Sequence, residues 1–353
     1  MGQMLSELRS LPHQNTGDTF PLLASDSIRW HHPLPPKIVA IGDLHGDLVA
    51  CAALCLKLGL INADGHWSGG DSHLVLMGDL VGGHKDSRLL LNMVMRLEQE
   101  ALAQGGMVHA LLGNHDLSPI QGLLHGMSRK EKMQYQDFPG PEDAFRGTTC
   151  YAEWIRTRNS ILRLGDWLFA HAGLDTWALA TEPCRINATI RAWVRFWQDA
   201  GPKPPANTYW VVATEDSARE HKLRPGPLWN RSLRVKLKKQ KYYHCPSDQP
   251  LDPQALDAAL LGWQAKRLVV GHCPIESGEI LMHHPLYREK IVMVDTRISA
   301  ADGSLSALCI TSEEVTPLYL KSREPGRAIR TVEKKLADRQ PRYGGLVRPS
   351  RSS

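Results

Sequence analysis

The sequence predicts an α/β fold, and three observations lead to this prediction. Short apolar runs recur along the chain, and glycine and polar residues follow each run at once. Runs of this kind are typical of buried strands. Two segments with helical patterns, 48–58 and 87–103, lie between the early runs, the second with Asp86 or Ser87 as its expected N-cap. Strands that alternate with helices indicate a sheet covered by helices.

The apolar runs also predict the order of the elements. The predicted strands are 37–41, 74–77, 108–112, 167–170, 268–270, 305–310 and 315–320. Long insertions separate the later strands, and their tryptophans and helical patterns predict caps over the sheet edge. We therefore divide the chain into an N-terminal extension, 1–36, a catalytic domain, 37–321, with cap insertions at about 117–166 and 174–262, and a tail, 322–353.

Composition and charge narrow the class of protein. The 353 residues are 42% apolar and 22% charged, as in ordinary globular proteins. The formal net charge is +5, but the tail holds nine Lys or Arg and three Asp or Glu, so it contributes +6 and the rest carries −1. The basicity therefore lies in the tail, for which we expect disorder, and no specific nucleic-acid partner is predicted.

The terminal sequence and the cysteines suggest a compartment. No apolar run is long enough for a bilayer, and no signal-peptide pattern is present. Seven scattered cysteines argue for a reducing environment. These features predict a cytoplasmic protein without a transmembrane segment. The first six residues also match, weakly, a pattern for N-myristoylation at Gly2. The sequence carries no signal for an oligomeric state.

Five predicted strands end in residues that bind metals. In chain order these are Asp43 and His45, Asp79, Asn114 and His115, His171, and His272. In open α/β sheets, ligands bind outside the carboxyl ends of the strands. Carboxylate, amide and imidazole donors suit Mn, Fe or Zn, with no need for a thiolate. The sequence therefore predicts a metal site at this edge.

The donors divide naturally between two ions. We expect Asp43 and His45 to hold the first, and Asn114, His171 and His272 to hold the second. Asp79 is expected to bridge them, because a carboxylate has two oxygens. Two ions about 3.5–4 Å apart generate a bridging hydroxide and clamp the oxygens of a phosphoryl displacement. His115 is then the candidate general acid, since imidazole transfers protons near neutrality.

Taken together, the blocks GDLHG, GDLV, GNHD, HAG and GHCP resemble the signature of the calcineurin-like metallophosphoesterases. Their order and spacing resemble the phosphoprotein phosphatase branch, and most of all the Shewanella-like phosphatases. Further matches are GTTCYAEWIRTRNSILRLGDWLFAHAGL, GPLWNR and VDTRISAADGSLSAL. The resemblance covers about residues 37–320. It implies a β-sandwich flanked by helices, the same six metal ligands, His115 as the catalytic acid and Arg231 as a phosphate-binding residue.

One block departs from the family pattern. The second block usually reads GDxVDRG, where the aspartate supports the histidine of GNH and the arginine grips phosphate. Here it reads GDLVGGHKDS, with Gly82 and Gly83 at those positions. Because they lie close by, Asp86 is predicted to orient His115, and Lys85 or His84 to supply positive charge.

The predicted function is hydrolysis of phosphomonoesters, with phosphoprotein carrying phosphoserine, phosphothreonine or phosphotyrosine as the expected substrate and a small phosphate ester as the other partner class. In GHCP, Pro274 stands where nucleases and diesterases of the superfamily have a second histidine, which disfavours them. A symmetrical dinucleoside tetraphosphate hydrolase is the alternative. A catalytically weak or non-enzymatic phospho-binding adaptor is the second alternative. The basic run 231–241 is interpreted mainly as a solvated cap surface, with attraction of anionic substrates as the other reading.

Overall fold

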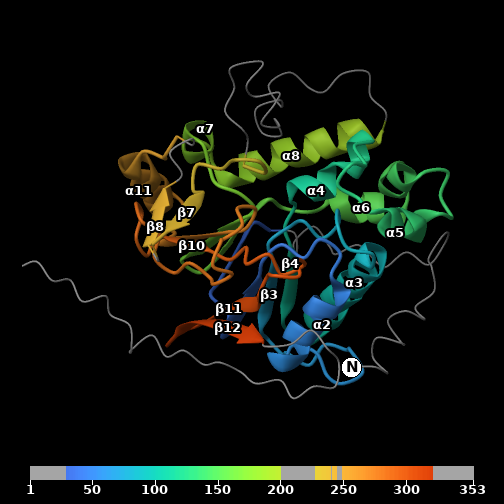
Figure 1. Cartoon of the computed structure of the whole chain (residues 1–353), viewed down its shortest axis with the longest axis horizontal. Coiled ribbons are helices and arrows are strands. Elements are labelled where there is room, and N and C mark those ends of the chain that lie inside the picture. The colour runs from blue at the N-terminus through green and yellow to red at the C-terminus, as the bar shows by residue number, and fades with distance from the viewer. Residues whose placement is uncertain (1–28, 200–226, 240, 245–248, 321–353) are drawn as a thin grey trace, which may run out of the picture.

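Two five-stranded sheets form the centre of the molecule, with helices around them (Figure 1). The computed structural model describes residues 29–199, 227–239, 241–244 and 249–320. The predicted tail, 322–353, and most of the N-terminal extension lie outside the described residues. The predicted α/β fold, a β-sandwich flanked by helices, is confirmed.

The first sheet contains the early predicted strands. Its order is β12-β11-β2-β3-β4, with β2, β3 and β4 parallel and β11 antiparallel to both β2 and β12. The strands are β2 (Lys37–Ile41), β3 (His73–Leu76), β4 (Met107–Ala110), β11 (Leu305–Thr311) and β12 (Val315–Leu320). Helices α2 (Leu48–Lys57) and α3 (Ser87–Ala103) connect the three parallel strands and lie beside them in Figure 1.

The second sheet has the order β1-β5-β6-β9-β10. Its strands are β1 (His31–His32), β5 (Ile161–Leu164), β6 (Trp167–Ala170), β9 (Arg267–Val270) and β10 (Ile291–Met293). Strands β6, β9 and β10 are parallel, while β5 is antiparallel to β6 and parallel to β1. The sequence predicted β6 and β9 but missed β1, β5 and β10. The short β1 ties the end of the N-terminal extension to this sheet.

The apolar strand residues form two clusters, as the two-residue period of a strand requires. In β2, Ile38 and Ala40 pack in the cluster between the sheets, with Val75 and Phe169 among their neighbours. Val39 and Ile41 point the other way, into the larger cluster that includes α2 and α3. A strand buried on both faces has no polar alternation, which explains why these runs are continuously apolar.

Both insertions contain the predicted helical segments. The first holds α5 (Arg129–Lys132), α6 (Cys150–Arg156), and the 3₁₀ helices η2 (Pro119–Gln121), η3 (Met133–Tyr135) and η4 (Pro141–Phe145), after α4 (Asn114–Leu117). The second holds α7 (Thr176–Leu179), α8 (Pro183–Gln198), α11 (Pro253–Gly262) and a hairpin of β7 (Val235–Lys238) and β8 (Lys241–His244). Most of these elements lie above the sheets in Figure 1. Within the described ranges, no helix combines the length and apolar character needed to cross a membrane.

A cluster of three histidines joins β1 to the first sheet. His73 Nδ1 and His109 Nε2 are 3.0 Å apart, and the ring of His32 lies 5.1 Å from that of His109. Burial, reinforced by His32, lowers the pKa of His73 to about 4. Burial also lowers the pKa values of His109 and His32. These side chains are therefore neutral in the folded protein at neutral pH.

We predict that acid weakens the fold through His73. The pKa of His73 is about 4 in the folded protein, against an ordinary value of 6.5. As the pH drops from 6.5 towards 4, the unfolded chain therefore binds a proton at this residue while the folded protein does not, and the free energy of unfolding falls. Between pH 7 and pH 5 this one group lowers the free energy of unfolding by about 2 kcal/mol. Denaturant titrations of the wild type and of His73→Gln at both pH values measure this change in the free energy of unfolding. The control is His283→Gln, at an exposed histidine. An unchanged pH dependence in His73→Gln would contradict the assignment.

Candidate active site

The predicted donors come together where the parallel strands of both sheets end. Asp43 follows β2, Asp79 follows β3, Asn114 follows β4, His171 follows β6 and His272 follows β9. All five are buried. The pattern of apolar run, glycine and polar residue thus identified one edge of the molecule. The roles of these residues as metal ligands stay predictions.

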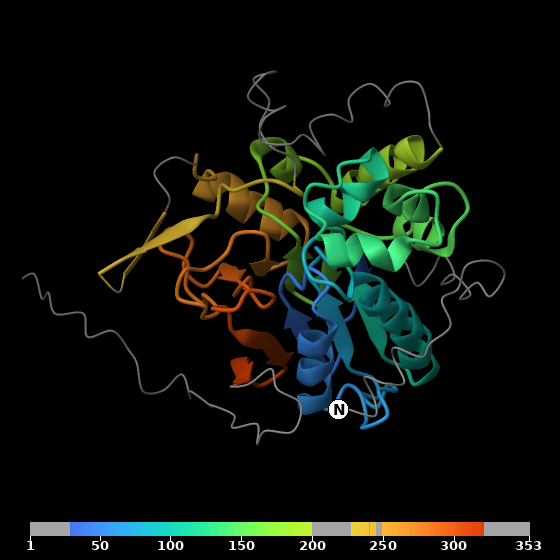
Figure 2. The ribbon, with the colours of Figure 1, turned by 45° about the vertical axis from the view of Figure 1, so that its right-hand side comes forward.

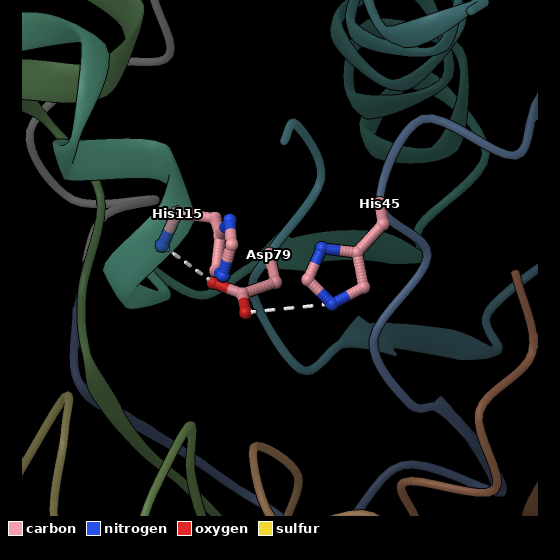
Figure 3. A group of neighbouring side chains, drawn as sticks. All are labelled: His45, Asp79 and His115. Carbon is pink, nitrogen blue, oxygen red and sulfur yellow. Dashed lines mark hydrogen bonds and ion pairs between the residues drawn. The ribbon is translucent and has the colours of Figure 1, made fainter. Parts of the chain in front are cut away.

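Asp79 lies between two groups of side chains. Figure 3 shows it between His45 and His115, with His45 Nε2 3.7 Å from Asp79 Oδ2. On its other side, His171 Nε2 is 3.5 Å from Asp79 Oδ1. His45, Asp79 and His115 form one group, and Asp79, His171 and His272 form the other; within each, the ligand atoms lie within 4.8 Å of one another. Asp79 is the shared member, as expected for a bridging carboxylate.

The tautomer of His171 follows from its contacts. Its Nδ1 donates to the carbonyl oxygen of Met77 at 2.8 Å, because that oxygen only accepts. In the neutral imidazole, Nε2 then has a lone pair, and it faces Asn114 Oδ1 at 3.0 Å. A backbone carbonyl that fixes the ring in this way is typical of metal-binding histidines.

His272 also has the properties of a ligand. Its Nε2 is buried and has no hydrogen-bond partner among the described residues. Burial, His171 and Arg231 keep its pKa well below the usual range, so the imidazole is neutral. Buried polar atoms are normally paired, and an orphan of this kind suggests a bound ion. The donor set therefore fits divalent metal ions.

Three of the site residues adopt a left-handed backbone conformation, which residues other than glycine seldom adopt. The φ angles are 45° at His45, 52° at Asp79 and 62° at His272. Left-handed residues of this type cost free energy and cluster at functional sites.

Asp43 lies against the backbone of His272. Its carboxylate accepts the backbone N–H of His272 at 3.0 and 3.2 Å, and it belongs to neither group around Asp79. Burial, then Asp295 and Asp79, raise its pKa well above the usual range. Asp295 follows β10, which runs parallel to β9 and so ends at the same edge. Our predicted set of ligands did not include Asp295. A cation would relieve the repulsion between these carboxylates.

The loop after β3 is held by the carboxylate of Asp116. Its two oxygens accept the backbone N–H groups of Asp79, Leu80 and Val81 at 2.8–3.2 Å. It also accepts the N–H of Gly113 at 2.8 Å. Burial and the charge of Asp79 raise the pKa of Asp116 to about 7. This residue is the last of the GNHD block, yet its role was not predicted.

Glu131 continues the same arrangement. It is fully buried, and its two oxygens accept the N–H groups of Gly82 and Gly83, each at 2.8 Å. Together with Asp116, it binds five consecutive backbone N–H groups, 79–83. Glu131 lies in α5 of the first cap, where Ser128 and Glu131 also form a capping box. The sequence showed only that local capping pattern, and the long-range contact was missed.

Gly82 is required where the family pattern has aspartate. Its φ is 87°, and a Cβ atom there would lie 2.4 Å from His115 Nδ1. Gly126 packs on the same imidazole, with a Cβ position 2.9 Å from Nδ1. The ring of His115 thus fills the space of the expected aspartate. The predicted contact from Asp86 is absent: the structure gives it no hydrogen bond to His115, and its Oδ2 is buried without a partner in the described chain.

The supply of positive charge by Lys85 or His84 stays a prediction. Lys85 is exposed and His84 is half-buried, with its backbone N–H bonded to His45 O at 2.5 Å. Arg231 is close to the second group, where its charge lowers the pKa of His272. Its segment is docked beside β6, because Ala172 N and Gly173 N donate to the carbonyl oxygens of Pro227 and Asn230, both at 3.2 Å.

Comparison with known proteins identifies relatives. A model of the calcineurin-like phosphoesterases matches residues 36–294. Shewanella-like protein phosphatase 2 of Arabidopsis thaliana is 26% identical over 204 residues, or 45% of this chain and 52% of that protein. Shewanella-like protein phosphatase 1 of Plasmodium berghei is 26% identical over 264 residues, which cover 72% of this chain and 65% of that protein. This chain therefore spans about half to two thirds of these relatives.

The solved structures agree on the fold. The cold-active protein-tyrosine phosphatase of a psychrophile, Shewanella sp., superposes with a TM-score of 0.64 at 24% identity, covering 84% of this chain and 82% of that one. The predicted resemblance to Shewanella-like phosphatases is confirmed. From the match over 36–294, the chain belongs to the calcineurin-like phosphoesterase family, a family of metal-dependent phosphoester hydrolases.

Proposed function

We propose that the protein is a metal-dependent phosphomonoesterase that acts on phosphoproteins. The observation that carries this proposal is the pair of ligand groups that share Asp79, with His115 in one group and Arg231 close to the other. A phosphoryl group bound between them would meet a nucleophile, a cationic clamp and a proton donor in one place. Positioning and preplaced charge supply most of the catalysis in phosphoryl transfer.

The metal ions would be held by the donors in and around the two groups that share Asp79. His45 and Asp43 would serve one ion, His171, His272 and Asn114 the other, and Asp79 both. Mn, Fe and Zn all suit this mixture of oxygen and nitrogen donors. Bound metal ions supply Lewis acidity and activate water as the nucleophile. The neutral state of His272 and the lone pair of His171 Nε2 support this assignment.

His115 would protonate the leaving oxygen. Its backbone N–H donates to Asp79 Oδ1 at 2.8 Å, so the residue is fixed to the shared carboxylate (Figure 3). Burial lowers the pKa of its imidazole, and Asp79 opposes that shift. A bound phosphate dianion adds negative charge, which favours the protonated form when a proton is needed. Arg231, with a planar guanidinium, would bind the phosphoryl oxygens.

The named relatives support phosphoprotein as the substrate class, since both are called protein phosphatases. The dinucleoside tetraphosphate hydrolase and the adaptor make different predictions, so one assay separates the three. Purified protein is given Mn²⁺ and then tested with p-nitrophenyl phosphate, phosphopeptides and a dinucleoside tetraphosphate, with metal analysis of the same sample. The proposal expects phosphate release from the phosphopeptides. Tight metal binding with cleavage only of the dinucleotide favours the hydrolase, and neither metal nor turnover favours the adaptor.

We predict that Asp79→Asn loses both metal and turnover. The amide has one oxygen donor in place of two and no charge, so it cannot serve both groups. Activity should fall by more than the roughly 10–100-fold that loss of an outer-shell partner costs. Metal content by mass spectrometry and p-nitrophenyl phosphate turnover measure this. Asp71→Asn, at an exposed aspartate before β3, is the control. Full activity in Asp79→Asn would rule out the shared-carboxylate mechanism.

We predict that Glu131→Gln impairs proton donation by His115. The glutamine side chain has one oxygen acceptor, and its NH₂ group would face a backbone N–H. Gly82 or Gly83 therefore loses its hydrogen bond to residue 131, and the loop that packs against His115 is held less firmly. General acid catalysis contributes about 10²–10⁴-fold and matters most for poor leaving groups. Turnover of a phosphoserine peptide should therefore fall at least about tenfold more than that of p-nitrophenyl phosphate.

Two controls distinguish this role from a loss of stability. Glu98→Gln breaks another buried carboxylate cluster, with Arg158 and Trp154, and should lower the melting temperature with equal effects on both substrates. In a His115→Ala background, Glu131→Gln should have little further effect on turnover. Equal losses on the two substrates in Glu131→Gln would show that Glu131 acts only on stability.

A further inference from the structure

The hairpin of β7 and β8 has two chemically different faces. Its strands are antiparallel, with Val235 opposite His244, Lys236 opposite Tyr243, Leu237 opposite Tyr242 and Lys238 opposite Lys241. Alternate residues of a strand point to opposite faces. One face therefore carries Val235, Leu237, Tyr242 and His244. The other, which we name the lysine face, carries Lys236, Lys238, Lys241 and Tyr243.

The first face is bound to the body of the molecule. Val235 is buried, and Tyr242 packs against the main core cluster. The hydroxyl of Tyr242 contacts Ser277 Oγ, and His244 Nε2 lies 2.8 Å from Ser232 O. These contacts fix which way the hairpin faces. The lysine face must then point to solvent, and Figure 2 shows the hairpin extending from the body.

The lysine face concentrates positive charge on an exposed surface. Lys236, Lys238 and Lys241 are exposed, and Tyr243 is 50% exposed. No ion pair with a carboxylate is present for these lysines within the described residues. Lys238 and Lys241 are directly opposed across the strands, an arrangement of like charges that destabilises a hairpin. An anionic partner laid along this face would relieve that repulsion.

The hairpin is rooted in the active site. Arg231 precedes β7 by four residues, in the segment that is docked on Ala172 and Gly173 beside His171. On the other side, the N–H of Leu237 donates to Glu276 Oε2 at 3.0 Å, in the loop that follows His272. Lys236 lies five positions after Arg231 in the chain, so the Cα atoms of the two residues are at most about 18 Å apart. An extended peptide covers that distance in about five residues.

We propose that the lysine face docks an acidic, extended segment of the phosphoprotein substrate, roughly five residues from the phosphorylated side chain. This inference rests on the proposed phosphatase function and deepens it by naming the substrate class. Charge selects acidic residues, the strand geometry suits an extended chain, and Tyr243 offers an apolar ring beside the charges. A peptide is favoured over nucleic acid because the chain without its tail has a net charge of −1.

Turnover of matched phosphopeptides by the whole 353-residue chain tests the proposal. The peptides carry one phosphoserine and, five residues away on the N- or C-terminal side, a run of either glutamates or glutamines. We expect a roughly tenfold higher kcat/KM for one glutamate peptide at low salt, mainly through KM, since three exposed ion pairs multiply to that order. Lys236→Gln/Lys238→Gln/Lys241→Gln should abolish this preference and leave p-nitrophenyl phosphate turnover unchanged.

A matched control isolates position from total charge. Lys57→Gln/Lys266→Gln/Lys290→Gln removes the same three charges elsewhere and should keep the preference. The proposal is overturned if wild type shows no preference, if the hairpin variant keeps it, or if the control variant loses it equally. Each of these results leaves phosphatase activity itself measurable with p-nitrophenyl phosphate.

Direct binding separates docking from catalysis. Fluorescence anisotropy with the unphosphorylated glutamate peptide reports docking even where turnover fails, so the two proposals fail independently. We expect binding that weakens about tenfold in the hairpin variant and falls with salt. A single-stranded oligonucleotide of equal charge is the competitor. Tighter binding of the oligonucleotide, lost in the same variant, would assign the lysine face to nucleic acid and overturn the peptide proposal.

Discussion

The position of Asp79 is the constraint on which the site depends. Its carboxylate is the only member common to both ligand groups, and its backbone is left-handed, with φ of 52°. Such a conformation costs of order 1–3 kcal/mol and persists only where the surroundings over-determine it. The Asp116 carboxylate provides that support, because it accepts the N–H of Asp79 and of the two residues that follow. The predicted metal site thus depends on a hydrogen-bonded loop as well as on the strand end.

The same loop explains why two glycines stand where side chains are expected. A side chain at 82 would collide with His115, and a Cβ at 83 would lie 3.0 Å from that of His45. The loop therefore holds both histidines by close backbone packing, and a carboxylate from the first cap, Glu131, holds the loop. This solution needs an insertion to supply the carboxylate. It links α5 to the loop that carries Asp79, so α5 supports the candidate site.

Much of this architecture could be predicted from the sequence, because the signals are local. An apolar run such as Lys37–Ile41 predicts a buried strand, and a metal-binding residue just after it is expected at the edge where the strands end. Strand β5 was missed because Arg163 interrupts its apolar pattern, and the β7–β8 hairpin was hidden in a basic run. The contacts of Glu131 could not be predicted, since they join residues 48 and 49 positions apart. Only the fold brings such partners together.

In the proposed mechanism Arg231 binds the phosphoryl oxygens, because glycine stands at 83 where the family pattern has arginine. Arg231 lies on a segment whose carbonyl oxygens accept hydrogen bonds from Ala172 and Gly173, next to His171. The same segment continues into β7, whose backbone is bonded to Glu276, four residues after His272. The proposed phosphate-binding residue, the predicted ligands His171 and His272, and the lysine face are therefore linked by short stretches of chain and by these hydrogen bonds. In the proposed complex this connection would set the spacing between the phosphorylated side chain and the substrate residues that flank it, and such positioning favours substrates with the matching spacing.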